Sequence, residues 1–404
     1  MLEYWLWLAG RRGIGARGLC ALLAQFGTPE AVFCAQQTQY PAQLRENGVQ
    51  SLLDKDLTPA REILQQCYRK NIHILTMQDA AYPQRLRTID DAPLVLYYQG
   101  ILPDFDAAPV IAMVGTRKAS AYGMLQSKRL GYELARCGVI VVSGGAGGID
   151  TLALRGAISA ETPPVAVFGC GADVDYPAAN HALFEDLRTR GCVLSEYPPG
   201  TPPLPEHFPT RNRLLSALSL GVVVVEAPKK SGALITANHA LEQGRDVFTL
   251  PGNVGNPSCA GNIQLLKQGA IVVEEGWDIL KEYTHLYPEL PLRQSSSAPL
   301  TLTAQETQQS LIVAESSAAP EKIDTKAVDK PEIRAYIDVQ EILPRLSADE
   351  AAVIGQLKTG KAPVDRIIDQ TQLPAGRVLS ALTLLEVKGY VKRLPARYYE
   401  LAKK

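Results

Sequence analysis

Four glycines within eight residues, in the segment SGGAGGID from Ser143 to Asp150, could bind a phosphate group. The segment follows the apolar run 139–142 and precedes a stretch with helical spacing. Glycine tolerates positive φ and lets a backbone approach a ligand, and the first N–H groups of a helix have no partner within it. The segment therefore has the layout of a turn that could hold a phosphate group.

This segment departs from two familiar phosphate-binding motifs. A dinucleotide fingerprint, G-x-G-x-x-G, would place a glycine where Asp150 stands, and the next apolar run ends in Gly169 rather than in an acid. A P-loop would continue with Gly-Lys-Ser or Gly-Lys-Thr, and this chain does not. We expect Asp150 to cap the following helix and to point away from a ligand. A glycine-rich turn that binds no ligand is the alternative interpretation.

A second segment, HFPTRNRLLSALS, places two arginines at the predicted start of a helix. With Thr210 as the expected N-cap, Arg211 and Arg213 fall in the first turn, where the helix dipole disfavours a cation by about 0.3–1 kcal/mol. An interaction elsewhere in the protein, or with a ligand, must therefore compensate for these two charges.

The side chain of Arg211 shares its helical face with nearby leucines and cannot simply extend into solvent. Its partner is either a carboxylate at a strand end, Glu196 or Glu226, or a bound anion. The aromatic ring of Phe208 could stack on a nucleic-acid base or belong to the core.

The framework that positions these residues follows from the pattern between 72 and 287. Apolar runs of strand length alternate with helical stretches, which predicts βαβ units and a mostly parallel sheet covered on both faces. The fold class is therefore α/β with an extended Rossmann-like sheet, and ligands are expected beyond the carboxyl ends of its strands. The apolar runs are 110–114, 139–142, 165–168, 192–194, 222–225, 247–250 and 271–273.

Two smaller domains are expected on either side of this sheet. Residues 1–71 read as a helical domain similar to a helix-hairpin-helix or sterile-alpha-motif module, with Thr28 as a helix N-cap. The Gly13-x-Gly15 turn could present N–H groups to a DNA phosphate or be an ordinary tight turn.

The C-terminal part divides into a linker and a winged-helix domain. Residues 288–340 are rich in Ser, Ala, Gln and Thr and predict a flexible linker, whereas 341–404 contain three helical segments followed by two β-like segments. Residues 341–404 carry 11 Lys and Arg against 7 Asp and Glu. The leucines expected on the core side of the third helix are Leu379, Leu382, Leu384 and Leu385.

Composition narrows the class of protein. The 404-residue chain is 46% hydrophobic with a net charge of −1, so it does not coat nucleic acid by bulk attraction. It has no apolar run of membrane-spanning length and no signal-peptide charge pattern, which predicts a cytoplasmic protein without membrane contact. Its seven cysteines are scattered without ligand spacing, so we expect neither disulfides nor a metal site.

Taken together, the motifs between 72 and 285 resemble those of the DNA-processing protein A family. The matching segments are GTRKAS, SGGAGGID, FGCGADVDYP, LSEYPPG, HFPTRNRLLSALS, VVVVEAPKKSGALITANHALEQGRDVFTLPGN and GNIQLLKQGA. One departure lies in TLALRGA, where the family usually has His and this chain has Leu154.

The resemblance implies a protein that binds single-stranded DNA, forms a homodimer through the Rossmann domain and loads the RecA recombinase during natural transformation. It implies no cofactor, no metal and no catalytic residue. The implied DNA-binding residues are Gly115, Thr116, Arg117, Ser143, Gly144, Gly145, Gly147, Gly148, Phe208, Arg211, Arg213 and Arg245.

Two rival functions come from other classes. Nucleotide phosphoribohydrolases share a Rossmann sheet with glycine-rich strand ends, but their pattern carries a catalytic Glu that the segment EAPKKSGALITANHA lacks. A winged-helix transcription regulator would fit the basic C-terminal domain. However, the third predicted helix has only Arg377 and Lys388, at its two ends, and so offers few side chains that could contact bases in a major groove.

Overall fold

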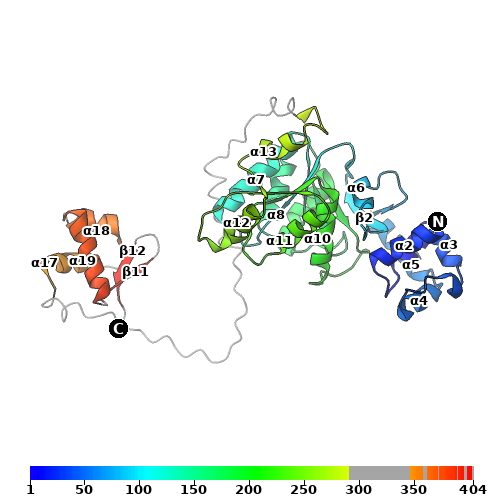
Figure 1. Cartoon of the computed structure of the whole chain (residues 1–404), viewed down its shortest axis with the longest axis horizontal. Coiled ribbons are helices and arrows are strands. Elements are labelled where there is room, and N and C mark those ends of the chain that lie inside the picture. The colour runs from blue at the N-terminus through cyan, green and yellow to red at the C-terminus, as the bar shows by residue number, and fades with distance from the viewer. Residues whose placement is uncertain (291–345, 358–361, 372, 389, 395–397, 403–404) are drawn as a thin grey trace. The chain divides into compact units, whose positions relative to one another are not determined.

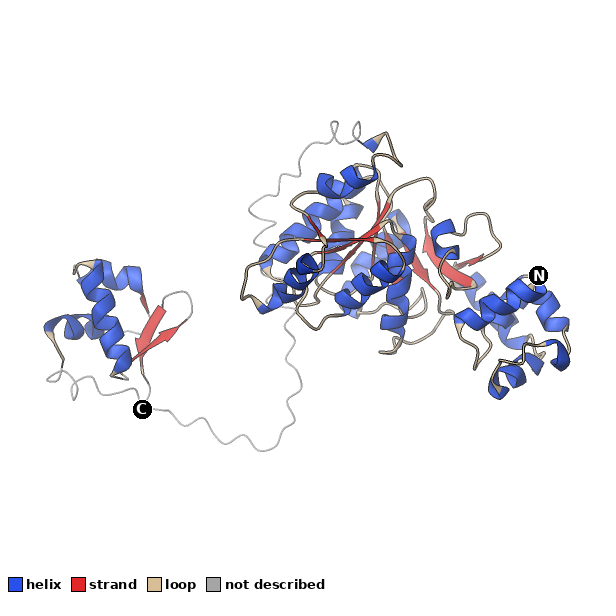
Figure 2. Ribbon diagram, viewed as in Figure 1, coloured by secondary structure: helices blue, strands red, loops and turns tan. Residues whose placement is uncertain are grey.

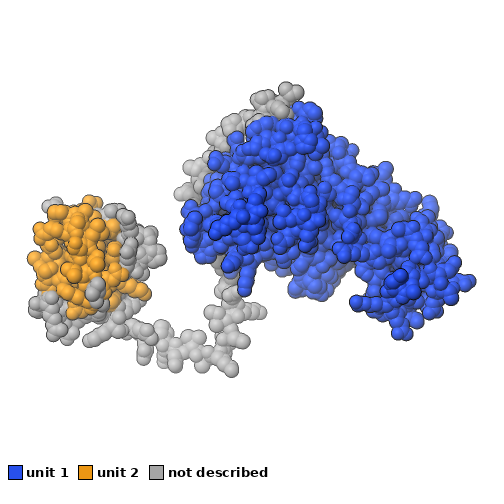
Figure 3. All heavy atoms as spheres, viewed as in Figure 1, with its two compact units in different colours: residues 1–319 blue, residues 320–404 orange. Residues whose placement is uncertain are grey.

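The structure is a computed structural model that describes residues 1–290, 346–357, 362–371, 373–388, 390–394 and 398–402 (Figure 1). The chain divides into two compact units, residues 1–319 and 320–404, and each is described by itself (Figure 3). Residues 291–340 of the predicted linker and residues 341–345 lie outside the described part of the chain.

The first unit begins with a bundle of short helices. Thr28 caps one of them as predicted, because its hydroxyl accepts the N–H of Ala31 at 3.1 Å. Gly13 adopts a φ of +77°, and a Cβ there would lie 2.8 Å from the Asn47 side chain, so this turn closes against its neighbour in the bundle. A DNA contact at this turn stays a prediction. The helices are α1 (Leu2–Ala9), α2 (Ala16–Phe26), α3 (Pro29–Cys34), α4 (Glu46–Leu53) and α5 (Thr58–Arg69).

A nine-stranded sheet follows, in the order β1-β2-β6-β5-β4-β3-β7-β8-β9. The strands from β3 to β9 pair in parallel, and β2 runs antiparallel to both β1 and β6. The predicted mostly parallel sheet is therefore confirmed. The strands are β1 (His73–Thr76), β2 (Val95–Gly100), β3 (Val110–Val114), β4 (Ile140–Ser143), β5 (Val165–Phe168), β6 (Cys192–Ser195), β7 (Gly221–Val224), β8 (Asp246–Thr249) and β9 (Ile271–Val272).

Helices cover both faces of this sheet (Figure 2), because its strands are apolar on both sides. One core cluster joins the strands to α6, α10 and α11, and a second joins them to α7, α8 and α13. The helices of this part are α6 (Gln84–Arg87), α7 (Ala121–Arg136), α8 (Ile149–Ile158), α9 (His181–Arg190), α10 (His207–Leu218), α11 (Gly232–Glu242), α12 (Ala260–Lys267) and α13 (Gly276–Leu280).

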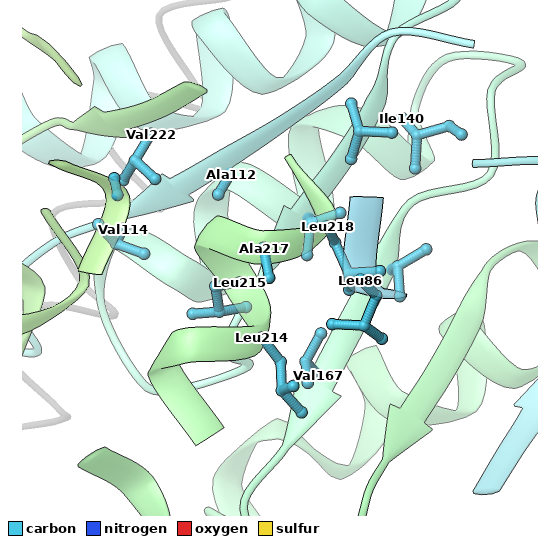
Figure 4. Close-up of a cluster of buried hydrophobic side chains, with 14 of the residues drawn as sticks. Leu86, Ala112, Val114, Ile140, Val167, Leu214, Leu215, Ala217, Leu218 and Val222 are labelled. Atoms are coloured by element: carbon cyan, nitrogen blue, oxygen red, sulfur yellow. The ribbon is translucent and has the colours of Figure 1, made fainter. Parts of the chain in front are cut away.

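Helix α10 is placed by the order of the strands. It connects β6 to β7, which lie on opposite sides of β5, β4 and β3, so it must cross the sheet. Leu214, Leu215, Ala217 and Leu218 point from α10 toward strand residues such as Val167 (Figure 4). The helix therefore begins near the carboxyl ends of β4 and β5.

The second unit has its own apolar core and a three-stranded antiparallel sheet. Its order of helices and strands confirms the predicted winged-helix domain. Leu382 and Leu385 are buried as expected, but Leu379 and Leu384 are 47% and 51% exposed, so their predicted place in the core is wrong. The elements are α17 (Ala348–Leu357), β10 (Ala362–Pro363), α18 (Val364–Thr371), α19 (Ala375–Val387), β11 (Val391–Leu394) and β12 (Tyr398–Leu401).

Across the described residues of both units, none of the helices combines the length and apolar character needed to cross a membrane. All seven cysteines are free in the structure, and Cys34 is the exposed one among them.

Candidate nucleic-acid interface

A pocket of about 180 Å³ opens at the carboxyl edge of the sheet. Three neighbouring strands, β3, β4 and β5, each contribute the loop that follows them, and α10 contributes its first turn. This is the edge at which parallel sheets bind ligands. The lining residues are Arg117, Gly144, Ala146, Gly147, Tyr176, Pro177 and Phe208.

The glycine-rich loop after β4 has the conformation that its sequence predicts. Gly145 and Gly148 adopt φ values of +68° and +78°, which favour glycine. A Cβ on Gly148 would lie 2.5 Å from the carbonyl oxygen of Thr116, and the N–H of Ile149 donates to that oxygen at 3.2 Å. A Cβ on Gly115 would likewise lie 2.5 Å from Ile149. The loops after β3 and β4 therefore pack so closely that glycine is required on both sides.

Asp150 lies beneath this loop instead of capping α8. Gly148 is the N-cap residue, and the Asp150 carboxylate is buried at 6% exposure, where it accepts the N–H of Ala146 at 3.4 Å. Burial raises the pKa of Asp150 to about 6, and the nearby Arg211 charge offsets part of that effect. The prediction that Asp150 points away from the pocket agrees with this geometry, whereas its predicted capping role is wrong.

Arg211 holds the same loop from below. It is 4% exposed, and its guanidinium donates to the carbonyl oxygen of Gly144 at 2.8 Å and also to that of Val167. Burial lowers the pKa of Arg211 and the Asp150 charge raises it again. The expected partners Glu196 and Glu226 are therefore wrong for this side chain.

Helix α10 begins three residues earlier than Thr210, the predicted N-cap. Helix α10 begins at His207, so Thr210 is its fourth residue, and the Thr210 hydroxyl donates to the carbonyl oxygen of Glu206 at 3.0 Å. Arg211 and Arg213 consequently lie in the second turn, where the helix dipole has largely faded. The prediction missed this because Pro209 is well tolerated inside a first helical turn.

Three further residues of the predicted site lie away from the pocket. Arg213 is 6% exposed and forms ion pairs with Asp91 at 3.1 Å and with Glu196 at 2.7 Å. Arg245 precedes β8, at the opposite edge of the sheet, where it donates to the carbonyl oxygen of Arg85.

The third, Ser143, is fully buried within β4, and its hydroxyl donates to the carbonyl oxygen of Met113 at 2.7 Å. Its side chain therefore connects two strands of the sheet instead of facing the pocket.

The pocket wall combines aromatic rings with a cation. The Arg117 guanidinium lies 5.9 Å from the ring centre of Phe208, and the Tyr176 ring lies 5.4 Å from the same ring. A Cβ on Gly169 would lie 3.0 Å from Phe208, so the glycine leaves room for this ring. Arg117 is exposed and forms no ion pair within the described ranges, so its charge is available to an anion.

Tyr176 and Pro177 were not among the predicted site residues. Tyr176 and Pro177 belong to FGCGADVDYP, the segment that follows β5. Since β5 is the neighbour of β4, this position beyond a strand end was the signal that could have identified them.

Comparison with known proteins places this geometry in a family. Residues 73–284 match the family model of the DNA recombination-mediator protein A, and residues 340–397 match that of the DprA winged helix domain. The chain is 36% identical over 246 residues to the DNA processing protein DprA of Bacillus subtilis, covering 61% of this chain and 83% of the relative.

Two further relatives extend the match. The chain is 33% identical over 335 residues to the protein Smf of Escherichia coli, covering 82% of this chain and 78% of the relative. The X-ray structure of DNA processing protein A from Streptococcus pneumoniae superposes with a TM-score of 0.62 at 32% identity, covering 70% of this chain and 98% of the other.

Proposed function

Because the chain belongs to the DNA processing protein A family, we propose that it binds single-stranded DNA in the pocket at the carboxyl edge of its sheet. In this proposal the protein is a non-enzymatic mediator of recombination, acting in the cytoplasm as a homodimer. It protects incoming single strands and loads the RecA recombinase on them during natural transformation.

The pocket itself is the observation that carries this proposal. It places an unpaired cation, Arg117, above the ring of Phe208 and next to the backbone of a glycine-rich loop. Exposed rings bind unstacked bases, and cations with free N–H groups bind phosphate. In a duplex the bases are already stacked and paired, so their faces cannot reach the rings. This arrangement supports a preference for single strands.

The proposed contacts differ from those that the sequence suggested. Arg211 acts from below by fixing the carbonyl of Gly144, and Arg213 belongs to an ion-pair cluster with Glu196. The residues proposed to touch the strand are Gly115, Thr116, Arg117, Gly144, Gly145, Ala146, Gly147, Gly148, Tyr176, Pro177 and Phe208.

We propose binding without hydrolysis at this pocket. Among the described residues that line it, the Tyr176 phenol could act as a general acid or base, and no carboxylate, imidazole or thiol accompanies it. Incubation with purine nucleoside monophosphates checks this point. Release of free purine base in molar excess over the protein would contradict the proposal.

The central test is a titration with single- and double-stranded oligonucleotides of matched sequence. Binding is measured by fluorescence anisotropy at several salt concentrations. We expect tighter binding to the single strand. With about three to five phosphate contacts, log K should fall with log[salt] with a slope of roughly −2 to −4. A preference for the duplex, or a slope near zero, would contradict the proposed mode of binding.

The steps that involve other proteins need their own measurements. Analytical ultracentrifugation of the full chain checks the homodimer. RecA loading is measured as ATP hydrolysis by RecA on single strands that are already coated with single-strand-binding protein. We expect this chain to shorten the lag before hydrolysis, and an unchanged lag would contradict the proposed mediator role.

A further inference from the structure

The loop that follows β7 lies next to the pocket and has no role in the function proposed above. The chain passes from β3 through β4 and β5 to β6 on one side, and then continues through β7 and β8 on the other side. The strand order therefore reverses between β3 and β7, and open α/β sheets bind ligands at such a switch point. The next helices, α7 and α11, pack on opposite faces, so the two loops diverge there.

Four exposed cations lie in these two loops. Arg117 and Lys118 follow β3, and Lys229 and Lys230 follow β7. The loops are adjacent because the N–H of Thr116 donates to the carbonyl oxygen of Glu226 at 2.7 Å. None of the four cations forms an ion pair with any residue that the structure describes.

The position of the two lysines is unfavourable in the free protein. Lys229 and Lys230 immediately precede Ser231, the N-cap of the 11-residue helix α11, whose hydroxyl accepts the N–H of Ala233 at 3.2 Å. The positive end of a helix dipole disfavours nearby cations, and these two also repel each other. Unlike Arg211 and Arg213, which lie in the second turn of α10, these two lysines lie directly before the first turn of their helix.

The space in front of this helix is open. Gly232 is exposed, and a Cβ there would meet no atom within 4 Å. The amide of Asn212 donates to the carbonyl oxygen of Gly232 at 3.3 Å, which fixes the helix start beside α10. The carboxylate of Glu226, two residues after β7, is 1% exposed. Its Oε2 accepts the N–H and the hydroxyl of Ser120, whereas its Oε1 has no hydrogen-bond partner among the described residues.

We propose that Lys229 and Lys230 extend the binding surface, so that a strand held in the pocket continues over Arg117 and across the loop that follows β7. Its next phosphates lie against the two lysines and the start of α11. The proposal rests on the function proposed above and adds a direction for the bound strand. Neighbouring strands lie about 4.8 Å apart, so the strand ends of β4 and β7 are roughly 10 Å apart, within reach of adjoining nucleotides.

The test is the double variant Lys229→Gln/Lys230→Gln, titrated with oligothymidylates of about 4 and about 16 nucleotides. We expect affinity for the long strand to fall about 3- to 30-fold and its salt slope to weaken by roughly 1.4, since about 0.7 is lost per phosphate contact. Affinity for the short strand should be unchanged, and the melting temperature unchanged or slightly raised.

The matched control is Arg155→Gln/Lys267→Gln, which also removes two charges. These residues lie in the last turns of α8 and α12, away from the carboxyl edge. Equal losses in both double variants would show a general charge effect and overturn the extension, as would unchanged affinity for the long strand or an equal loss for the short one. Failure of the unaltered protein to bind either strand would instead contradict the proposed function itself.

Discussion

Two regions of the molecule carry cations that the sequence associates with nucleic acid, and the structure uses them differently. At the carboxyl edge of the sheet, Arg117 is exposed and faces an open pocket. In the winged-helix unit, Arg377 and Lys388 at the ends of α19 are both held by carboxylates of α17. A cation is available to a phosphate only where the protein has not already paired it.

Two ion pairs join the ends of α19 to α17 in the winged-helix unit. Arg377 contacts Asp349 through two hydrogen bonds of 2.6 and 2.8 Å, and Lys388 contacts the buried Glu350 at 2.6 Å. The outer face of α19 exposes Leu379 and Leu384. With both of its cations paired, α19 offers little free charge for reading a major groove.

The largest expected effect separates buried from exposed arginine. Arg211→Ala would leave the buried Asp150 carboxylate without its compensating charge and release the carbonyl of Gly144, which should cost about 3–5 kcal/mol of folding stability. Arg117→Ala, the matched control, should melt within about 2 °C of the unaltered protein because it removes an exposed side chain. Thermal melting of both variants checks this, and equal melting temperatures would contradict the buried role.

A smaller effect concerns pH. Folding raises the pKa of Asp150 above the value near 3.9 that it has in the unfolded chain. Its contribution to folding stability is therefore fully present below about pH 3.9 and is lost as pH rises through the pKa of the folded state. For Asp150, with a pKa of about 6, the window is therefore pH 4 to 6. Relative to Asp150→Asn, the unaltered protein should gain roughly 2–3 kcal/mol when pH falls from 7 to 4. Urea unfolding of both proteins at pH 7 and pH 4 measures this gain. An equal stability difference between the two proteins at both pH values would contradict the raised pKa of Asp150.

Within the pocket, Phe208→Ala should weaken binding of single strands by about 1–3 kcal/mol, which is roughly 5- to 150-fold. Phe208→Tyr keeps a ring that can stack and should retain most of the affinity. The melting temperature of the alanine variant separates a lost contact from a damaged core. Full affinity in a folded Phe208→Ala protein would move the site away from this pocket.

The smallest effect is expected from removing the winged-helix unit. A fragment of residues 1–290 keeps Tyr287 and Leu290, which are buried in the sheet core, so a cut before them would damage the fold. Its affinity for single strands should stay within about threefold of the full chain. The isolated fragment 341–404 should not bind duplex DNA. If that fragment bound duplex DNA and the Lys388→Gln variant did not, Lys388 would be available to DNA, and the contrast between the two regions would be wrong.

Much of the framework was determined by the sequence alone. The apolar runs predicted β3 and β5 with their observed ends and the remaining parallel strands within one residue. The glycines of SGGAGGID predicted the tight turn after β4, and the winged-helix order was also correct. These features depend on local periodicity and on the conformations that each residue allows, which neighbouring residues fix.

Only the tertiary structure decided which charges are free. Arg213 pairs with Asp91, which lies 122 positions earlier in the chain, and the sequence gives no sign of that distance in space. The crossing of α10 over the sheet placed Arg211 beneath the glycine loop, and the start of β8 placed Arg245 at the opposite edge. Charge pairing and burial depend on contacts between distant segments, so a pattern of residue types cannot determine them.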